Sequence, residues 1–233
     1  MKKASVVIVT QNNEKSIARL LEALAYQDFK DFEVIIIDLC STDKTLVNAK
    51  PYPVKVFRLE SGKQSITRAL NLASRVCLAE DIFCLKGNNI PRYANFISSG
   101  LRSLSRPKTV LCFGPKYREN EAPIVRLISL ESWGELDSDD KLIEIKRIKD
   151  IYIDSCAFKK NNWLQFNFPE GGEASVWRWS SKFISDGYKI YFNPSMAVMS
   201  YEKTGLINYF REKRKRQKLY SLYQKKEKNG LLD

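Results

Sequence analysis

The fold is decided by the stretch Ser5-Val-Val-Ile-Val-Thr-Gln-Asn-Asn-Glu14, in which an apolar run ends abruptly in a polar turn. A continuous, mostly β-branched run of this length indicates a strand that is buried on both faces of a sheet. Apolar residues between Ile17 and Leu24 then recur at the spacing of an amphipathic helix, and Asn13 is its predicted cap. Strand, turn and helix together predict the first unit of an α/β domain.

The same alternation continues along the chain. Further strands are predicted over Glu33–Asp38, Val54–Arg58, Ile82–Leu85 and Thr109–Phe113, with helices beginning near Ser41, at Gly62 and after Pro91. Shorter strands are predicted over Ile151–Phe158, Tyr188–Phe192 and Ala197–Met199, with a helix that ends at Gly187 before the last two. This order predicts a mostly parallel sheet flanked by helices on both faces. Residues 118–150 carry no motif that assigns them a role.

Composition narrows the classes of protein to which the chain can belong. At 233 residues with 44% apolar content, the chain is long enough for one α/β domain with a substantial core. It contains no histidine, which excludes Ser-His-Asp triads, Cys-His dyads and histidine-ligated metals. Its five cysteines never form a C-x-x-C pair, so we expect a reduced, cytoplasmic protein without structural zinc. We expect neither a membrane span nor a signal peptide.

Positive charge is concentrated near the C-terminus. The formal net charge is +12, and nine Lys or Arg residues lie between Arg211 and Lys228 against two Glu residues. We predict a basic amphipathic helix over 204–233, following a globular domain over 1–203. Such a composition is typical of a helix on an anionic membrane surface, here through 206–228. A helix that binds nucleic acid nonspecifically or stays solvated is the alternative.

The order of these segments resembles the inverting GT-A glycosyltransferases of family 2. The opening stretch is similar to the family's first strand and its Pro-Thr-Tyr-Asn-x-Glu turn, and Ser41–Asp43 is similar to the serine-threonine-aspartate after the second strand. Gly62-Lys63 and Ala69–Asn71 look like the family's next helix, and Gly187–Ile190 looks like the end of its acceptor-side helix. The resemblance covers residues 4–203 and implies a GT-A fold with a nucleotide-sugar donor bound beyond the strand ends.

The stretch Asp-Ile-Phe-Cys-Leu-Lys-Gly-Asn-Asn-Ile-Pro, Asp81–Pro91, stands where the family carries its metal-binding Asp-x-Asp motif. In the family this motif holds a divalent cation on the donor diphosphate. Lys86, Gly87 and Asn88 replace it, so we expect no metal site and no cofactor beside the sugar nucleotide itself. The ammonium of Lys86 can instead stabilise the charge on a leaving diphosphate. The alternative is a solvated loop lysine in an inactive site.

The resemblance implies further donor-site residues. Thr10 and Gln11 stand on the first turn, with Gln11 in place of the family's base-stacking aromatic residue. Asp38 either contacts the nucleotide or caps the turn that follows it. Lys63 either reaches a phosphate or faces solvent. Asn88 is the last of the predicted donor-binding residues.

Two carboxylates are candidates for the general base that deprotonates an acceptor hydroxyl. Glu173 is the first, because it lies two residues before Ser175-Val176, where the alignment places the family's Glu-Asp pair. Asp154 is the second. For Glu173 the alternative is a purely structural role, in which its charge favours the start of the helix at Ala174.

Three hypotheses follow for the function. The leading one is a metal-independent glycosyltransferase that acts on a cell-surface glycan or a lipid-linked acceptor at the inner membrane face. The alternative is a catalytically inactive relative that serves as a binding or scaffolding subunit of a glycan-assembly complex. A nucleic-acid-binding protein is the third, and the globular part lacks an aromatic-basic RNA motif that would support a specific nucleic-acid partner.

Overall fold

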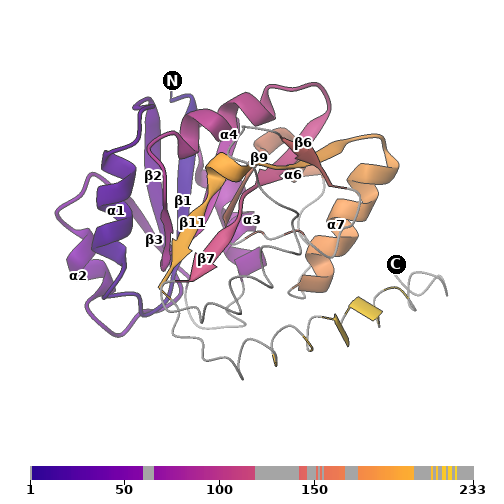
Figure 1. Ribbon diagram of the computed structural model, residues 1–233. Helices are drawn as coiled ribbons and strands as arrows, with labels where there is room; N and C mark the ends of the chain where they lie inside the picture. Colours follow the sequence, from indigo (N-terminus) through magenta and orange to yellow (C-terminus); the bar gives the residue numbers. More distant parts are fainter. Residues whose placement is uncertain are drawn as a thin grey trace.

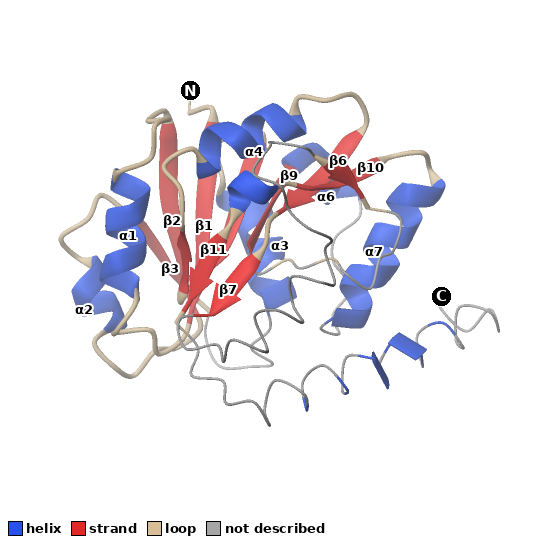
Figure 2. Ribbon diagram, viewed as in Figure 1, coloured by secondary structure: helices blue, strands red, loops and turns tan. Residues whose placement is uncertain are grey.

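A large mixed β-sheet with helices on both faces forms the centre of the molecule (Figure 1). The computed structural model describes residues 2–59, 66–118, 142–145, 151, 153, 155–165 and 173–201, together with seven separate positions between 211 and 224. Figure 2 shows the strands gathered between the α1 and α2 helices on one side and the α7 helix on the other.

The predicted elements are present in the predicted order, together with several additional ones. The first part of the chain contains β1 (Ala4–Thr10), α1 (Ile17–Ala25), β2 (Phe32–Asp38), α2 (Thr45–Ala49), β3 (Lys55–Arg58), α3 (Ile66–Val76), β4 (Asp81–Lys86), β5 (Asn89–Pro91), α4 (Phe96–Leu104), β6 (Thr109–Phe113) and β7 (Lys116–Arg118). The second part contains β8 (Ile143–Glu144), β9 (Ser155–Lys159), α6 (Lys160–Gln165), α7 (Glu173–Ser185), β10 (Lys189–Phe192), the 3-10 helix η2 (Pro194–Met196) and β11 (Val198–Ser200). The elements that are additional to the predicted ones are β5, β7, β8, α6 and η2.

The central sheet has eight strands in the order β3-β2-β1-β4-β9-β6-β10-β8. The four strands from β3 to β4 are parallel, and so are β6 and β10, which confirms the predicted mostly parallel α/β sheet. β9 runs antiparallel between β4 and β6, and β8 runs antiparallel at the edge. A second sheet has the order β5-β11-β7 and extends the fold beyond the end of β4.

The core consists of two apolar layers because β1 is buried on both faces. Val7 and Val9 belong to one cluster that also contains residues of α3, α6 and α7, among them Leu70 and Trp163. Val6, on the alternate face of β1, belongs to a second cluster with residues of α1 and α4. A strand has a side-chain period of two, so an uninterrupted Val/Ile run is what a double-sided layer requires.

Two details of the turns differ from the sequence-based predictions. Pro91 does not start a helix, because it pairs with Val198 in the small sheet and α4 begins only at Phe96. Asn13 is not the cap of α1, whose N-terminal cap residue is Ser16. The Asn13 side chain instead accepts hydrogen bonds from the Thr10 hydroxyl and the Gln11 backbone. For Pro91, pairing with a residue distant in sequence outweighs its preference for a helix start. For Asn13, hydrogen bonds within the loop outweigh its preference for a helix cap.

In the second half of the chain, the predicted helix before Gly187 and the two strands after it are confirmed. α7 is followed by Gly187, whose φ of 78° lies in the left-handed region that glycine favours. Strand β9 begins at Ser155, four residues later than predicted. The described positions between Arg211 and Gln224 are helical, and the Tyr220 ring lies 5.2 Å from that of Trp177 on α7.

All five cysteines are free thiols, and burial raises the pKa of Cys77 to about 12, so this thiol is unreactive.

Candidate functional site

Four parallel strands end at one edge of the sheet and bring together residues that are far apart in sequence. Thr10 on β1 pairs in register with Asp38 on β2, and Asp38 pairs with Arg58 on β3. On the other side of β1, Val9 pairs with Lys86 at the end of β4. The predicted donor residues Thr10, Asp38 and Lys86 therefore share one edge. Ligands bind beyond this edge in open α/β sheets, so the arrangement defines the candidate site.

Asp38 is completely buried at the end of β2. Its carboxylate accepts hydrogen bonds from the Ser41 backbone at 3.0 Å and from the Ser41 hydroxyl. The Arg58 guanidinium lies 3.5 Å away, and its side chain remains 55% exposed to solvent. These contacts show Asp38 stabilising the turn that follows it, as one of the two sequence-based alternatives predicts. They also place an exposed cation, Arg58, directly beside it.

The loops after β1 and β2 are joined by hydrogen bonds into one rim. Asn12 donates its backbone N–H to the Ser41 hydroxyl at 3.0 Å and accepts from the Thr42 backbone at 2.9 Å. Further along, Asn13 donates its backbone N–H to Thr45 Oγ1 at 2.7 Å. The rim is thus fixed by short polar side chains, which is the usual role of Asn, Ser and Thr in turns.

Asp43 is the carboxylate that anchors this rim. It accepts hydrogen bonds from the backbone N–H groups of Glu14 and Thr45, at 3.0 Å and 2.9 Å, and one from the Thr45 hydroxyl. Desolvation raises the pKa of Asp43, but the hydrogen bonds from Thr45 and Glu14 outweigh it and hold this pKa below the ordinary aspartate value. Asp43 is therefore a structural anion of the loop.

The turn after β4 packs tightly against the loop after β1. Gly87 donates its N–H to the Val9 carbonyl at 2.9 Å, and its own carbonyl accepts from the Ser16 hydroxyl at 2.9 Å. A Cβ added at Gly87 would lie 2.5 Å from Asn13 Oδ1 and 2.5 Å from Thr10 Oγ1. Only glycine allows this approach. The packing places Lys86 and Asn88 on either side of a fixed backbone.

The residues of this turn do not fit a divalent cation. Mg²⁺ and Mn²⁺ prefer carboxylate and carbonyl oxygens, and Lys86 brings a positive charge to the position of the first expected ligand. Within the described ranges, no group of three or more His, Cys, Asp or Glu residues is placed to hold a metal ion.

Three predicted site residues fall outside what the structure describes. Lys63 and Asp154 lie outside the described residues, and Glu173 is described only as the first residue of α7, not for its side chain. Ser155, next to Asp154 in sequence, pairs with Leu85 of β4. Of the remaining predictions, Gln11 is exposed on the β1 loop and Asn88 is buried in the turn.

Sequence reasoning missed two cationic residues beside the site. Arg58 ends a predicted strand, and the rule that parallel strands end at one edge was enough to place it there. Arg19 on α1 lies over the Tyr201 ring, with its Cζ 5.2 Å from the ring centroid. Tyr201 donates its backbone N–H to the Asn88 carbonyl at 3.0 Å, and no local sequence pattern predicts this contact.

The sequence model of glycosyl transferase family 2 matches residues 5–168. The chain belongs to this family. Over 79 residues this family 2 chain is 42% identical to the poly(ribitol-phosphate) beta-N-acetylglucosaminyltransferase TarS of Staphylococcus aureus. That match covers 31% of this chain but only 14% of TarS. The finding confirms the family resemblance and gives no support to the alternative of an inactive scaffolding subunit.

Solved structures show the same fold. The mannosyltransferase PcManGT from Pyrobaculum calidifontis, in complex with GDP-Man and Mn²⁺, superposes with a TM-score of 0.67 at 18% identity, covering 87% of this chain and 58% of that one. Residues 1–349 of S. aureus TarS give a TM-score of 0.64 at 21% identity, covering 85% of this chain and 60% of that one. The predicted GT-A architecture is confirmed. This family 2 chain spans less than two thirds of the length of each of these relatives. No helix in the described part of the chain has the length and apolar content needed to span a membrane.

Proposed function

We propose that this chain is a glycosyltransferase domain that transfers a sugar from a nucleotide diphosphate to a cell-surface glycan without a divalent metal ion. The observation that carries the proposal is the position of Lys86. It ends β4 beside Val9, on the edge where Thr10 and Asp38 also lie, and Gly87 fixes the backbone that follows it. An ammonium held at this point can perform the charge stabilisation that a cation performs elsewhere in the family.

The proposed donor site combines the residues of the edge with Lys63, which the family resemblance assigns to it. Thr10 and Gln11 are assigned to the nucleoside, beside the turn that Asp38 stabilises, and Lys86, Asn88 and Lys63 are assigned to the diphosphate. Support comes from the neighbours, because PcManGT was solved with GDP-Man and TarS 1–349 with UDP-GlcNAc. A nucleotide-sugar donor is therefore the class of co-substrate that the fold accommodates in related proteins.

The reaction is proposed to be a single displacement at the anomeric carbon. A carboxylate, Glu173 or Asp154, takes the proton of the acceptor hydroxyl, whose oxygen then bonds to that carbon. The bond from the anomeric carbon to the diphosphate oxygen breaks, and the diphosphate leaves with the electron pair. Lys86 stabilises the negative charge that accumulates on it.

The acceptor is proposed to be a glycan polymer or a lipid-linked precursor of one. TarS is named for action on poly(ribitol phosphate), which supports an acceptor of the cell-surface class. The basic segment 206–228 would hold the protein on the inner face of an anionic membrane, where such precursors are assembled.

Incubation with a panel of UDP-, GDP- and dTDP-sugars, with and without EDTA, tests the proposal. We expect one donor class to bind and to turn over equally well with EDTA present. A strong requirement for Mn²⁺ would contradict the role of Lys86, and failure to bind any sugar nucleotide would contradict the enzyme. Adding anionic vesicles in the same assay tests the membrane role, because the protein should then sediment with the vesicles.

A further inference from the structure

We propose that one face of the domain binds an anionic polysaccharide, which rests on the proposed function because the polymer would serve as its acceptor. This surface, called the cationic face, lies on α4, β5 and β7 and the residues that directly follow α4 and β5. It consists of the exposed residues Arg92, Arg102, Arg106 and Lys108, and the half-buried Lys116 and Arg118 of β7 lie at its border.

The charge of this segment is entirely one-sided. Between Ile82 and Arg118 the chain contains seven Lys or Arg residues and not a single Asp or Glu. The segment 187–201, which supplies the neighbouring β10, η2 and β11, also lacks acidic residues. Two carboxylates of neighbouring elements in the described part of the chain are engaged by other residues, since Asp28 accepts from the Ser98 hydroxyl at 2.8 Å and Glu144 pairs with Lys189 at 3.0 Å. A concentration of like charge costs stability, which suggests that it serves a ligand.

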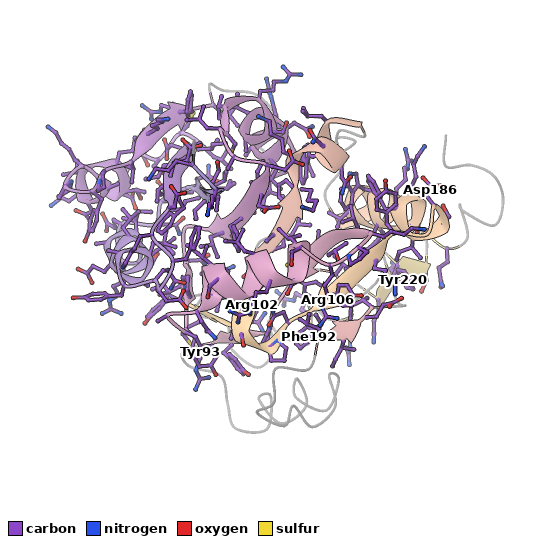
Figure 3. All side chains as sticks on the ribbon, turned by 90° about the horizontal axis from the view of Figure 1, so that it is seen from above. Tyr93, Arg102, Arg106, Asp186, Phe192 and Tyr220 are labelled. Atoms are coloured by element: carbon purple, nitrogen blue, oxygen red, sulfur yellow. The ribbon has the colours of Figure 1, made fainter. Side chains whose placement is uncertain are left out.

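The packing of α4 directs its arginines outward. The helix buries Phe96, Ile97 and Leu104, and a Cβ on Gly100 would lie 2.4 Å from the Phe83 ring, so this face sits close on the sheet. Arg102 and Arg106 are exposed on the opposite side. Figure 3 shows Tyr93, Arg102 and Arg106 along the same edge of the molecule.

Tyrosine rings hold two of the guanidinium groups in place. The Cζ atom of Arg92 lies 5.0 Å from the ring centroid of Tyr117 and 5.6 Å from that of Tyr93. The Cζ atom of Arg106 lies 5.5 Å from the ring centroid of Tyr191. A stacked guanidinium keeps its N–H edge free to bind phosphate or carboxylate in a bidentate manner. Because the rings limit its motion, less side-chain entropy is lost on binding.

The same geometry favours a polysaccharide over a membrane or a nucleic acid. A membrane-binding face needs apolar side chains that enter the lipid, and Tyr93 is the large exposed hydrophobic residue of this face in the described part of the chain. Single-stranded nucleic acids stack their bases on free aromatic rings, whereas Tyr93, Tyr117 and Tyr191 are engaged by arginines. Cations spaced along a surface match a flexible polymer with repeated anionic groups.

The cationic face begins at the candidate active site. β5 follows the Lys86–Asn88 turn directly, and β11, its partner, continues into Tyr201, which binds the Asn88 carbonyl. A polymer held along β5 and α4 would therefore extend toward the edge where the donor is proposed to bind. Retention of a long acceptor near the site raises its effective concentration for repeated transfers.

The test compares two charge-matched variants of the full chain. R92Q/R102Q/R106Q removes three charges from the cationic face, and K50Q/R75Q/K182Q removes three exposed charges from α3, α7 and the residue directly after α2. Binding of fluorescein-labelled poly(glycerol phosphate) is measured by anisotropy, with dextran as the neutral polymer. We expect the first variant to bind about tenfold more weakly at physiological salt, and the control to bind within about twofold of wild type.

Further measurements on the same variants decide the outcome. Unchanged binding by R92Q/R102Q/R106Q, or an equal loss in the control, overturns the proposal. So does an equal loss of binding to a single-stranded oligonucleotide of matched length or to phosphatidylglycerol vesicles, because the face would then recognise any polyanion. If the first variant melts at a lower temperature, R102E, which changes one exposed side chain, must still weaken polymer binding. UDP-sugar binding is measured separately, so that polymer binding without any donor binding leaves this proposal standing while the proposed enzyme fails.

Discussion

The two halves of the candidate active site are held together by different means. On the β2 side, the carboxylates of Asp38 and Asp43 are already engaged by donors of the chain itself. On the β4 side the turn contains no carboxylate and is held by the Val9 carbonyl, the Ser16 hydroxyl and the close approach at Gly87. The β4 turn therefore keeps its shape without the charge at position 86. Chemistry at that position can change while the fold stays the same.

The largest expected effect follows from removing that charge. Lys86→Ala should lower the rate of sugar transfer by about a hundredfold, the size seen when one preorganised donor to a developing anion is lost. Stability should change little, because the turn is held by its backbone. Lys86→Arg should retain part of the activity, since the positive charge remains. The measurement is the steady-state rate with the donor that the nucleotide-sugar panel identifies.

Lys55→Ala is the matched control for this change. Lys55 begins β3 and pairs with Glu33 at 3.0 Å, away from the strand ends that form the site. This substitution removes the same charge and the same side chain as Lys86→Ala, and the rate should stay within about twofold of wild type because Lys55 lies away from the site. Equal rates for Lys86→Ala and wild type would show that the β4 half does not contribute to catalysis.

An intermediate effect is expected from filling the space at Gly87. Gly87→Ala forces its Cβ against Asn13 Oδ1 and Thr10 Oγ1, so unfolding should become easier by about 2 kcal/mol. The melting temperature should fall by roughly 4–8 °C for a domain of this size. In an Asn13→Ala background the same change should cost less, because one of the two opposing atoms is gone. If the effects of the two substitutions on the free energy of unfolding simply add, the cost of Gly87→Ala does not come from its contact with Asn13.

The sequence predicted the frame of this site better than its contacts. Periodicity located β1, β2 and β4, and the rule for parallel strands then placed Thr10, Asp38 and Lys86 at one edge. It missed that the Asn13 side chain binds Thr10 and Gln11 of its own loop, because a cap and a loop contact are both local options for Asn. It missed that Pro91 joins a strand, because that pairing depends on Val198, which is distant in sequence. β9 is antiparallel within the sheet, and no property of its own five residues indicates that direction.

The chemistry of the site was less accessible to sequence reasoning than its location. The substitution of Lys86 for an expected carboxylate was visible at once from the family resemblance. The ion pair between Arg58 and Asp38 could not be predicted in this way, because ion pairs between strands depend on the register of the strands. The cationic face was also missed, although the absence of Asp and Glu between Ile82 and Arg118 was its signal in the sequence.

The smallest expected effect lies in the β2 half and depends on pH. Asp43→Asn should reduce stability at neutral pH by about 1 kcal/mol, because a surface-accessible anion loses part of its hydrogen bonding to Thr45 and Glu14. The pKa of Asp43 is depressed in the folded state, so its contribution is present above the ordinary value of 3.8 and is lost as the pH falls below it. The difference between wild type and variant should therefore shrink in acid.

Urea unfolding at neutral pH and near pH 3 measures this change, with the exposed Asp186→Asn as control. Gly87→Ala provides the contrast, because a steric cost between uncharged atoms does not titrate and should be the same at both pH values. If the Asp43→Asn difference were equally independent of pH, the β2 half would be held by shape, as the β4 half is. A difference that titrates for Asp43 and not for Gly87 would confirm that polar bonding to carboxylates fixes one half of the site and close packing the other.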